Sequence, residues 1–259
     1  MIKEPTLELA RDRLRDRGVI AVVSGKGGVG KSTVSALTAL SIANRDYAVL
    51  IDLDIHGMSV PRLFGIENKM HDVSREGLEP IMINERLGII SLRGGVIGSK
   101  YVVLPGERRG GVLLDLLAYT NYGDSKYVIV DMPPGMSDEL LILHRVRNYL
   151  PIVVTSPSRQ SVGVVEDLVR YLTDSGGIRP TAMIINMAFM KCDHEVVKPF
   201  GSTDWAIELA RKYGIEVVKE LPIDPAIEEY IGKINEYSGQ LLTELSSMIN
   251  TVIQEVQRY

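Results

Sequence analysis

Short apolar runs rich in β-branched residues alternate with longer helical patterns along most of the 259 residues. Strands that are apolar at nearly every position are buried on both faces, as in a parallel sheet covered by helices on each side. The expected strands are Val19–Val23, Tyr47–Ile51, Leu87–Leu92, Tyr127–Val130, Pro151–Val154, Thr181–Ile185 and Ile215–Val218. The expected helices are Lys31–Asn44, Gly111–Tyr119, Ser137–Asn148, Ser161–Asp174 and Thr203–Tyr213. The pattern predicts an α/β fold with a doubly wound, mostly parallel sheet.

No internal repeat or Pro/Ser-rich linker divides the chain, so we expect a single domain over residues 1–259. Residues 1–17 are expected to form a helical extension, in which Arg11–Arg17 places arginines and aspartates at the spacing of a solvated helix. Residues 236–259 are expected to contain a helix whose apolar stripe packs on the domain. The least regular stretch is Gly65–Gly110, where switching loops and plain surface loops fit the sequence equally well.

The composition argues against several classes of function. Lysine and arginine number 29 against 33 aspartates and glutamates, so the chain lacks the basic excess typical of non-specific nucleic-acid binding. Its one cysteine, Cys192, cannot form an intramolecular disulfide, and no apolar stretch reaches the roughly 18 residues that suggest a membrane span. The charged N-terminus has no signal-peptide core. We therefore expect a cytoplasmic protein that binds neither nucleic acid nor membrane.

A glycine-rich run lies directly between the first expected strand and the first expected helix. The run is Gly25, Lys26, Gly27, Gly28, Val29, Gly30, Lys31, Ser32 and Thr33. Its glycines let consecutive backbone N–H groups approach phosphate oxygens, and the helix adds its positive end. Lys31 is expected to reach the β- and γ-phosphates, Ser32 to ligate Mg²⁺ and Thr33 to lie near the α-phosphate. A glycine-rich turn without a ligand is the alternative, but strand, loop, lysine and helix together favour a P-loop.

Acidic residues follow two later strands. Asp52 and Asp54 come after Tyr47–Ile51, and alternation along an extended strand would send both carboxylates to the same side. Asp131 follows Tyr127–Val130. Carboxylates beside Mg²⁺ and a γ-phosphate can hold metal-bound waters and orient the attacking water. An isolated aspartate at a strand end is often only a helix cap, but three segments in this order favour a nucleotide site.

The run Gly25–Thr33 resembles the deviant Walker A motif of a family that includes the septum-site ATPase MinD, the partition ATPase ParA, the nitrogenase iron protein and the Mrp-type iron–sulfur carriers. In that family the lysine after the first glycine reaches across a dimer interface to the partner's nucleotide. The resemblance therefore implies an ATP-sandwiched homodimer in which Lys26, Lys31 and Asp54 are the catalytic residues.

The same resemblance implies roles for the acidic segments. Asp54 matches the residue that positions or activates water, and Asp52 would support the outer shell of the metal. Asp131 would bind a metal water, while Gly135 could donate its backbone N–H to the γ-phosphate. The metal set implied for Mg²⁺ is thus Ser32, Asp52, Asp54 and Asp131.

The segments Asp52–Gly65 and Asp131–Gly135 narrow the resemblance to the Mrp/ApbC branch. By that resemblance Asn186 offers an amide to adenine, and Pro222 and Asp224 belong to a second loop near the base and ribose. Asn186 would end the strand that precedes it. These residues could instead be plain loop formers.

One departure from the branch lies at Met190–Glu195. Mrp-type carriers usually have C-x-x-C here, and two such pairs bridge a [4Fe–4S] cluster across the dimer. This chain keeps Cys192 but has Glu195 in place of the second cysteine. Fe–S clusters select thiolates, usually four, and a dimer of this chain would offer two. Ancestry favours a cluster at Cys192 and an Fe–S client or assembly protein as partner. A loop cysteine without metal is equally compatible.

Three functions are compatible with these features. The leading one is a Mg²⁺-dependent, ATP-hydrolysing homodimer resembling the Mrp/ApbC carriers. A MinD- or ParA-type positioning ATPase ranks second, because the net charge is negative and the terminal helix has few cations for binding a surface. A nucleotide-sensing regulator that binds ATP but barely hydrolyses it would differ from the first only in rate.

Overall fold

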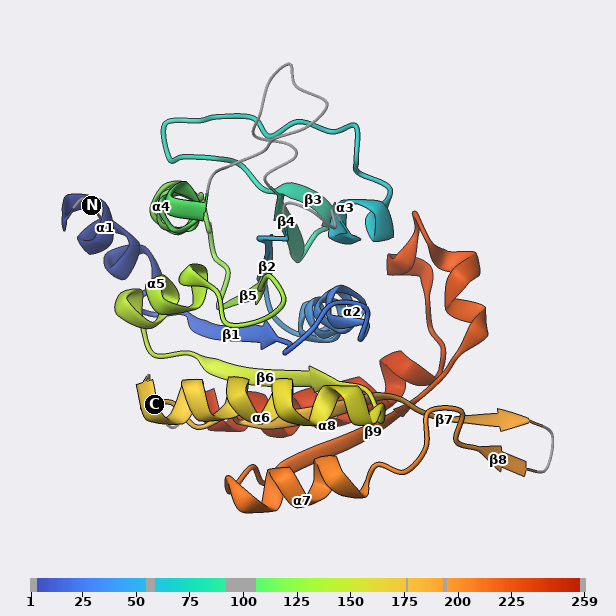
Figure 1. Ribbon diagram of the computed structural model, residues 1–259. Coiled ribbons are helices and arrows are strands. Elements are labelled where there is room, and N and C mark those ends of the chain that lie inside the picture. The colour runs from blue at the N-terminus through green and yellow to red at the C-terminus, as the bar shows by residue number, and fades with distance from the viewer. Residues whose placement is uncertain (1–3, 55–58, 92–105, 176, 193–194, 257–259) are drawn as a thin grey trace.

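The computed structural model describes residues 4–54, 59–91, 106–175, 177–192 and 195–256. In this part of the chain one nine-stranded sheet has the order β3-β4-β2-β5-β1-β6-β7-β8, and β9 also pairs with β7 (Figure 1). Only the β3–β4 and β7–β8 pairs are antiparallel. The strands are β1 Gly18–Val23, β2 Ala48–Asp52, β3 Ile81–Asn84, β4 Leu87–Ser91, β5 Tyr127–Asp131, β6 Leu150–Thr155, β7 Ala182–Cys192, β8 Glu195–Val197 and β9 Val217–Pro222. The predicted mostly parallel α/β fold is confirmed.

Helices cover both faces of the sheet (Figure 1). One core contains residues of α1, α4, α5, α6 and α7, and the other contains residues of α2, α3 and α8. Alternate residues of β1 enter the two cores, with Val19 and Ala21 in the first and Ile20 and Val22 in the second. The helices are α1 Glu4–Leu14, α2 Lys31–Ala43, α3 Ser59–Phe64, α4 Gly106–Tyr119, α5 Asp138–Val146, α6 Val162–Arg170, α7 Asp204–Lys212 and α8 Gln240–Val256. Burial on both faces explains why these strands are apolar throughout.

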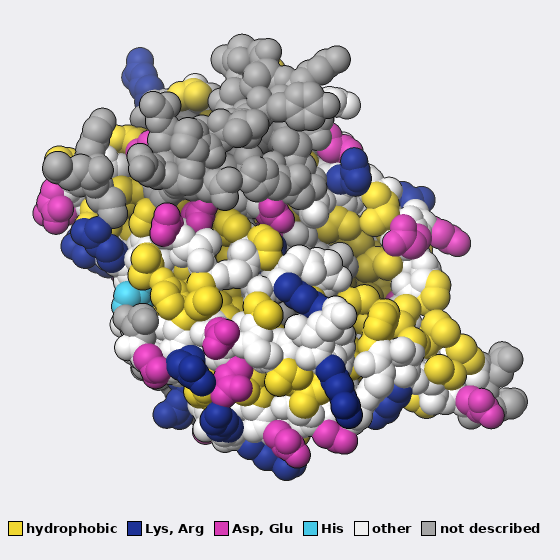
Figure 2. Space-filling model, in the orientation of Figure 1, with side chains coloured by type: hydrophobic (Ala, Val, Ile, Leu, Met, Phe, Trp, Pro, Cys, Tyr) yellow, Lys and Arg dark blue, Asp and Glu magenta, His cyan; other side chains and the backbone are white. Residues whose placement is uncertain are grey.

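The two terminal helices pack against the body of the protein. Helix α1 contributes Leu7, Ala10 and Leu14 to the core beside α4, so it is more than the expected solvated extension, and it ends at Leu14 rather than Arg17. Helix α8 packs its expected apolar stripe on α2 and β9. No helix among the described residues is long and apolar enough to cross a membrane. On the face shown in Figure 2, acidic and basic side chains are interspersed rather than separated by sign.

Strand β7 corrects the expected end at Asn186. The strand continues to Cys192 and turns back into β8, forming a hairpin that projects from the body (Figure 1). Met187 has a φ of 57°, and the register of β7 with β9 shifts between Ile185 and Phe189. This bulge lets the strand leave the sheet after pairing regularly with β6 and β9.

Two further boundaries differ from the sequence prediction. Helix α6 ends at Arg170, and the rest of the expected segment forms a π-helical turn over Tyr171–Ser175. Helix α4 begins at Gly106, inside the stretch Gly65–Gly110 that was expected to be least regular, and this stretch also contains β3 and β4. Residues 92–105 of that stretch lie outside the described part, as does the expected strand end at Leu92.

The carboxyl ends of the central strands meet at one edge of the sheet. Asp52 at the end of β2 is paired in register with Asp131 at the end of β5, and β1 lies between β5 and β6. Ligands of open α/β sheets bind outside this edge. The fold therefore brings the glycine-rich loop and the acidic segments together.

Candidate functional site

The glycine-rich loop connects the end of β1 at Val23 to the start of α2 at Lys31. Gly28 and Gly30 have φ angles of 79° and 83°, in the left-handed region that favours glycine. A Cβ on Gly30 would lie 2.3 Å from the amide nitrogen of Asn186. The loop thus turns sharply ahead of α2, whose first backbone N–H groups have no helical acceptor and can meet an anion.

Two hydrogen bonds hold this loop in place. The Asn186 amide donates to the carbonyl of Val29 at 2.9 Å. The backbone N–H of Gly135 donates to the carbonyl of Ser24 at 2.8 Å. The family resemblance assigned the Asn186 amide to adenine and the Gly135 N–H to the γ-phosphate. In this structure both groups instead donate to carbonyls of the loop segment.

A buried ion pair lies at the N-terminus of α2. The Lys31 ammonium is 2.6 Å from Oδ1 of Asp131, and their side chains are only 6% and 0% exposed. The Ser35 hydroxyl donates to the same oxygen at 2.7 Å. The second oxygen of Asp131 is buried and has no hydrogen-bond partner in the described part of the chain. The network thus has room for one more donor to Asp131.

The carboxylates of Asp52, at the end of β2, and Asp54, two residues later, have different surroundings, contrary to the simple alternation argument. The backbone N–H of Asp54 donates to Oδ1 of Asp52 at 3.0 Å, so the chain turns here instead of continuing extended. Asp52 is buried, and burial together with the neighbouring Asp131 raises the pKa of its carboxyl well above the usual range. Asp54 is half-buried and faces the open cavity.

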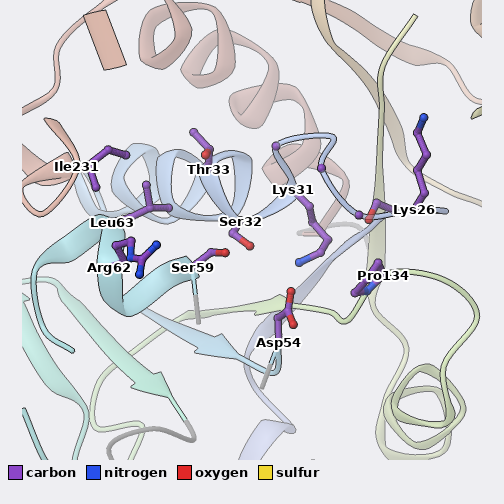
Figure 3. Close-up of a pocket in the computed structure, with 14 residues that line it drawn as sticks. Lys26, Lys31, Ser32, Thr33, Asp54, Ser59, Arg62, Leu63, Pro134 and Ile231 are labelled. Atoms are coloured by element: carbon purple, nitrogen blue, oxygen red, sulfur yellow. The ribbon is translucent and has the colours of Figure 1, made fainter. Parts of the chain in front are cut away.

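The cavity beside the loop has a volume of about 390 Å³. In Figure 3 the carboxylate of Asp54 points toward the Lys31 ammonium, whereas the Lys26 side chain points away from both. Residues not expected at the site also line the cavity, among them Arg62 and Ile231. Its lining comprises Ser24, Lys26, Gly27, Gly28, Gly30, Lys31, Ser32, Thr33, Asp54, Ser59, Arg62, Leu63, Pro134 and Ile231.

The residues expected near the base do not line this cavity. Pro222 is buried at the end of β9. Asp224 caps the 3₁₀ turn Pro225–Tyr230 by accepting from the N–H of Ala226 at 3.0 Å. Its other oxygen accepts a 2.5 Å hydrogen bond from the Tyr237 hydroxyl, and desolvation of that hydroxyl together with Asp224 raises its pKa. Asp224 thus fixes the loop conformation.

Comparison with known protein families also indicates a P-loop NTPase. A model of the ParA family, described as the NUBPL iron-transfer P-loop NTPase, matches residues 16–257. The chain belongs to this family. The resemblance to the iron–sulfur branch of the MinD/ParA superfamily, which the nucleotide motifs predicted, is confirmed.

Two relatives of this P-loop NTPase carry the description cytosolic Fe-S cluster assembly factor. NUBP2 of Homo sapiens is 32% identical over 237 residues, which cover 86% of this chain and 87% of the relative. CFD1 of Kluyveromyces lactis is 31% identical over 245 residues, which cover 89% of this chain and 86% of the relative. The similarity therefore extends over nearly the whole of each protein.

Solved structures show the same fold. A nucleotide-binding protein from Archaeoglobus fulgidus, in complex with ADP and with cobalt, is 31% identical and superposes with a TM-score of 0.78 over 92% of this chain and 96% of its own. The cell division ATPase MinD of Pyrococcus furiosus is 17% identical, with a TM-score of 0.64 over 93% of this chain and 99% of its own. The latter shares the fold.

The acidic part of this P-loop NTPase site suits a hard divalent cation. Two buried carboxylates, Asp52 and Asp131, lie in register on adjacent strands, with Lys31 as the cation paired to Asp131. The free oxygen of Asp131 is an acceptor for a metal-bound water. Carboxylate, hydroxyl and water oxygens are the ligands that Mg²⁺ prefers. The residues present therefore fit Mg²⁺.

The hairpin residues do not fit a resident Fe–S cluster. Cys192 is an exposed free thiol, and its cross-strand neighbour is Glu195. No described residue of the hairpin belongs to a group of three or more His, Cys, Asp or Glu side chains that could hold a metal. Asp193 and His194, between the two strands, lie outside the described residues. One thiolate per chain falls short of the four that a [4Fe–4S] cluster usually requires.

Proposed function

We propose that this protein is a Mg²⁺-dependent ATPase that works as a cytoplasmic homodimer in iron–sulfur cluster assembly. The observation that carries the proposal is the buried Lys31–Asp131 pair at the start of α2, directly behind a loop turned by Gly28 and Gly30. Lys31 then needs only to exchange a carboxylate for phosphate oxygens. The relatives described as cytosolic Fe-S cluster assembly factors support the cellular role and the location.

In the proposed bound state the loop from Gly25 to Gly30 surrounds the phosphates with backbone N–H groups, and Thr33 lies near the α-phosphate. Lys31 moves from Asp131 to the β- and γ-phosphates. Mg²⁺, when bound, would neutralise charge on these phosphates, held by Ser32 with Asp52, Asp54 and Asp131 acting partly through water. A cation near Asp52 and Asp131 would also favour the ionised form of Asp52, whose pKa is raised by burial and, to a smaller extent, by the neighbouring Asp131.

The adenine contacts that we propose involve Asn186, Pro222 and Asp224. The amide nitrogen of Asn186 is used by Val29, and among the described residues its oxygen accepts no hydrogen bond. That oxygen is the group that would accept a hydrogen bond from the adenine amino group. The loop of Pro222 and Asp224 would lie beside the ribose, with Asp224 held by Tyr237.

Lys26 is proposed to act on the partner's nucleotide, and Lys26→Ala tests this. Because the side chain points away from its own Lys31 (Figure 3), its loss should leave ATP binding to one chain within a few-fold of the wild type. ATP-dependent dimerisation should disappear, and kcat should fall by about 100-fold or more because a cation at the transition state is lost.

The measurement is the mass of the protein in solution with and without a slowly hydrolysed ATP analogue, together with steady-state hydrolysis. Lys69→Ala, which removes an exposed lysine that does not line the cavity, is the matched control and should dimerise normally. Normal ATP-dependent dimers and normal hydrolysis for Lys26→Ala would disprove the sandwiched dimer.

The role of Cys192 is tested by anaerobic reconstitution with iron and sulfide. Since a dimer supplies two thiolates, we expect wild type and Cys192→Ala to bind equally little iron per dimer. The proposed contribution to assembly would then be ATP-driven action on a client or assembly protein that holds the cluster. About four irons per dimer in the wild type, lost in Cys192→Ala, would show instead that the altered hairpin carries a cluster.

A further inference from the structure

The cavity contains a cationic side chain to which the proposed mechanism gives no role. Arg62, on α3, lines the cavity together with Ser32 and Thr33. Its side chain is exposed, and it makes no ion pair or side-chain hydrogen bond with any other described residue. Lys31, by contrast, is already paired with Asp131. Arg62 is therefore a guanidinium in a ligand-sized cavity with its donors unused.

Helix α3 presents this guanidinium from a fixed position. Val60, Leu63 and Phe64 are buried in the core on the α2 side of the sheet. The helix is followed by Gly65, which has a φ of 66° and at which a Cβ would lie 2.3 Å from the carbonyl oxygen of Gly232. The N–H of Gly232 in turn donates to the carbonyl of Leu63 at 3.0 Å. A side chain held on such an anchored element can bind a ligand with little loss of backbone entropy.

The neighbours of Arg62 indicate which part of a nucleotide it would meet. In Figure 3 it lies beside Ser59 and Leu63, on the side of Ser32 and Thr33, while Lys26 and Pro134 are at the opposite end. Leu63 and Ile231 make this end of the cavity apolar, so it suits a less charged part of the nucleotide better than the γ-phosphate. Arg62 thus lies between the phosphate-binding loop and the apolar end.

We propose that Arg62 is a nucleotide-binding residue that contacts the phosphates nearest the nucleoside, which ADP and ATP share. Arginine suits this position because its planar fork can donate two parallel hydrogen bonds to phosphate oxygens. The inference rests on the proposed nucleotide site and adds a third cation to Lys26 and Lys31. It assigns Arg62 to binding and leaves the γ-phosphate to the other two.

The test compares Arg62→Ala and Arg62→Lys with wild type. Each protein is titrated in a calorimeter with ADP or with a slowly hydrolysed ATP analogue, in the presence of Mg²⁺. Because Arg62→Ala loses a charge-assisted contact, its affinity for both nucleotides should fall by about 10- to 100-fold. The affinity of Arg62→Lys should lie between those of Arg62→Ala and wild type, because lysine keeps the charge but lacks the planar guanidinium that donates two parallel hydrogen bonds. The melting temperature without nucleotide should not change, because the side chain has no partner to lose.

Arg211→Ala, which removes an exposed arginine of α7 outside the cavity, is the control and should bind both nucleotides normally. Unchanged affinity in Arg62→Ala would overturn the inference and leave the proposed function intact. A loss confined to the ATP analogue would also overturn it, because Arg62 would then contact the γ-phosphate. If wild type bound neither nucleotide, the proposed function would fail and the inference with it.

Discussion

Replacing Lys31 by alanine should abolish tight binding of both ATP and ADP. Each charge-assisted hydrogen bond contributes roughly 1.5–3 kcal/mol, and Lys31 is proposed to reach two phosphates. The dissociation constant should therefore rise by about 100-fold or more. The measurement is a calorimetric titration with Mg²⁺ present, well below the melting temperature of the variant. Binding of wild-type strength in Lys31→Ala would contradict the whole phosphate site.

The same variant should also be less stable without nucleotide, for a separate reason. Lys31 and Asp131 are both buried, and removing one partner leaves the other as an uncompensated buried charge. Such a loss typically costs about 3–5 kcal/mol. The hydrogen bond from Ser35 to Asp131 remains and should keep the cost toward the lower end.

A double variant separates the two effects. Lys31→Ala with Asp131→Asn removes the uncompensated charge, so stability should recover in part while nucleotide binding stays lost. Lys126→Ala is the matched control, because Lys126 also pairs with an aspartate, Asp46, at 2.7 Å, but on the surface. Exposed ion pairs contribute little, so this variant should melt and bind nucleotide almost normally. Recovery of nucleotide binding in the double variant would mean that Lys31 only stabilises the folded site and does not contact the phosphates.

The central sheet could be predicted from the sequence because its strands are buried on both faces. Runs such as Val19–Val23 and Tyr127–Val130 are apolar at every position, so their length and spacing indicated a parallel sheet, and each appears within one residue at either end. The turn before α2 was predictable for a related reason. Gly28 and Gly30 adopt backbone angles that other residues avoid.

The elements that could not be predicted are short or depend on distant contacts. Strand β8 has three residues, all exposed, so it carries no hydrophobic pattern. The bulge at Met187 has a positive φ at a residue that does not favour it, and the β7 extension follows from it. The burial of Asp52 depends on Asp131 of a neighbouring strand. Arg62 lies in the segment Asp52–Gly65, which resembles the Mrp/ApbC branch. Its place in the cavity could not be predicted, because it depends on how α3 is anchored against Gly232.

Replacing Asp54 by asparagine should slow hydrolysis while sparing nucleotide binding. Asparagine keeps the shape of the side chain, and the backbone N–H of Asp54 can still donate to Asp52. The carboxylate that faces the cavity is lost, and with it the proposed group that orients and activates water. Positioned acid–base groups contribute about 10²–10⁴-fold, so kcat should fall by about 100-fold or more. The dissociation constant for a slowly hydrolysed ATP analogue should change by only a few-fold.

Single-turnover hydrolysis with excess enzyme is the deciding measurement, because it isolates the chemical step from product release. Asp167→Asn, at an exposed position on α6, is the control and should hydrolyse ATP at the wild-type rate. An unchanged rate in Asp54→Asn has a specific meaning. If the wild type is itself barely active, removing the carboxylate has nothing to slow, and the protein would be a nucleotide-sensing regulator. If the wild type is active, water must be activated by another group, and the turn that brings Asp54 to the cavity would serve binding alone.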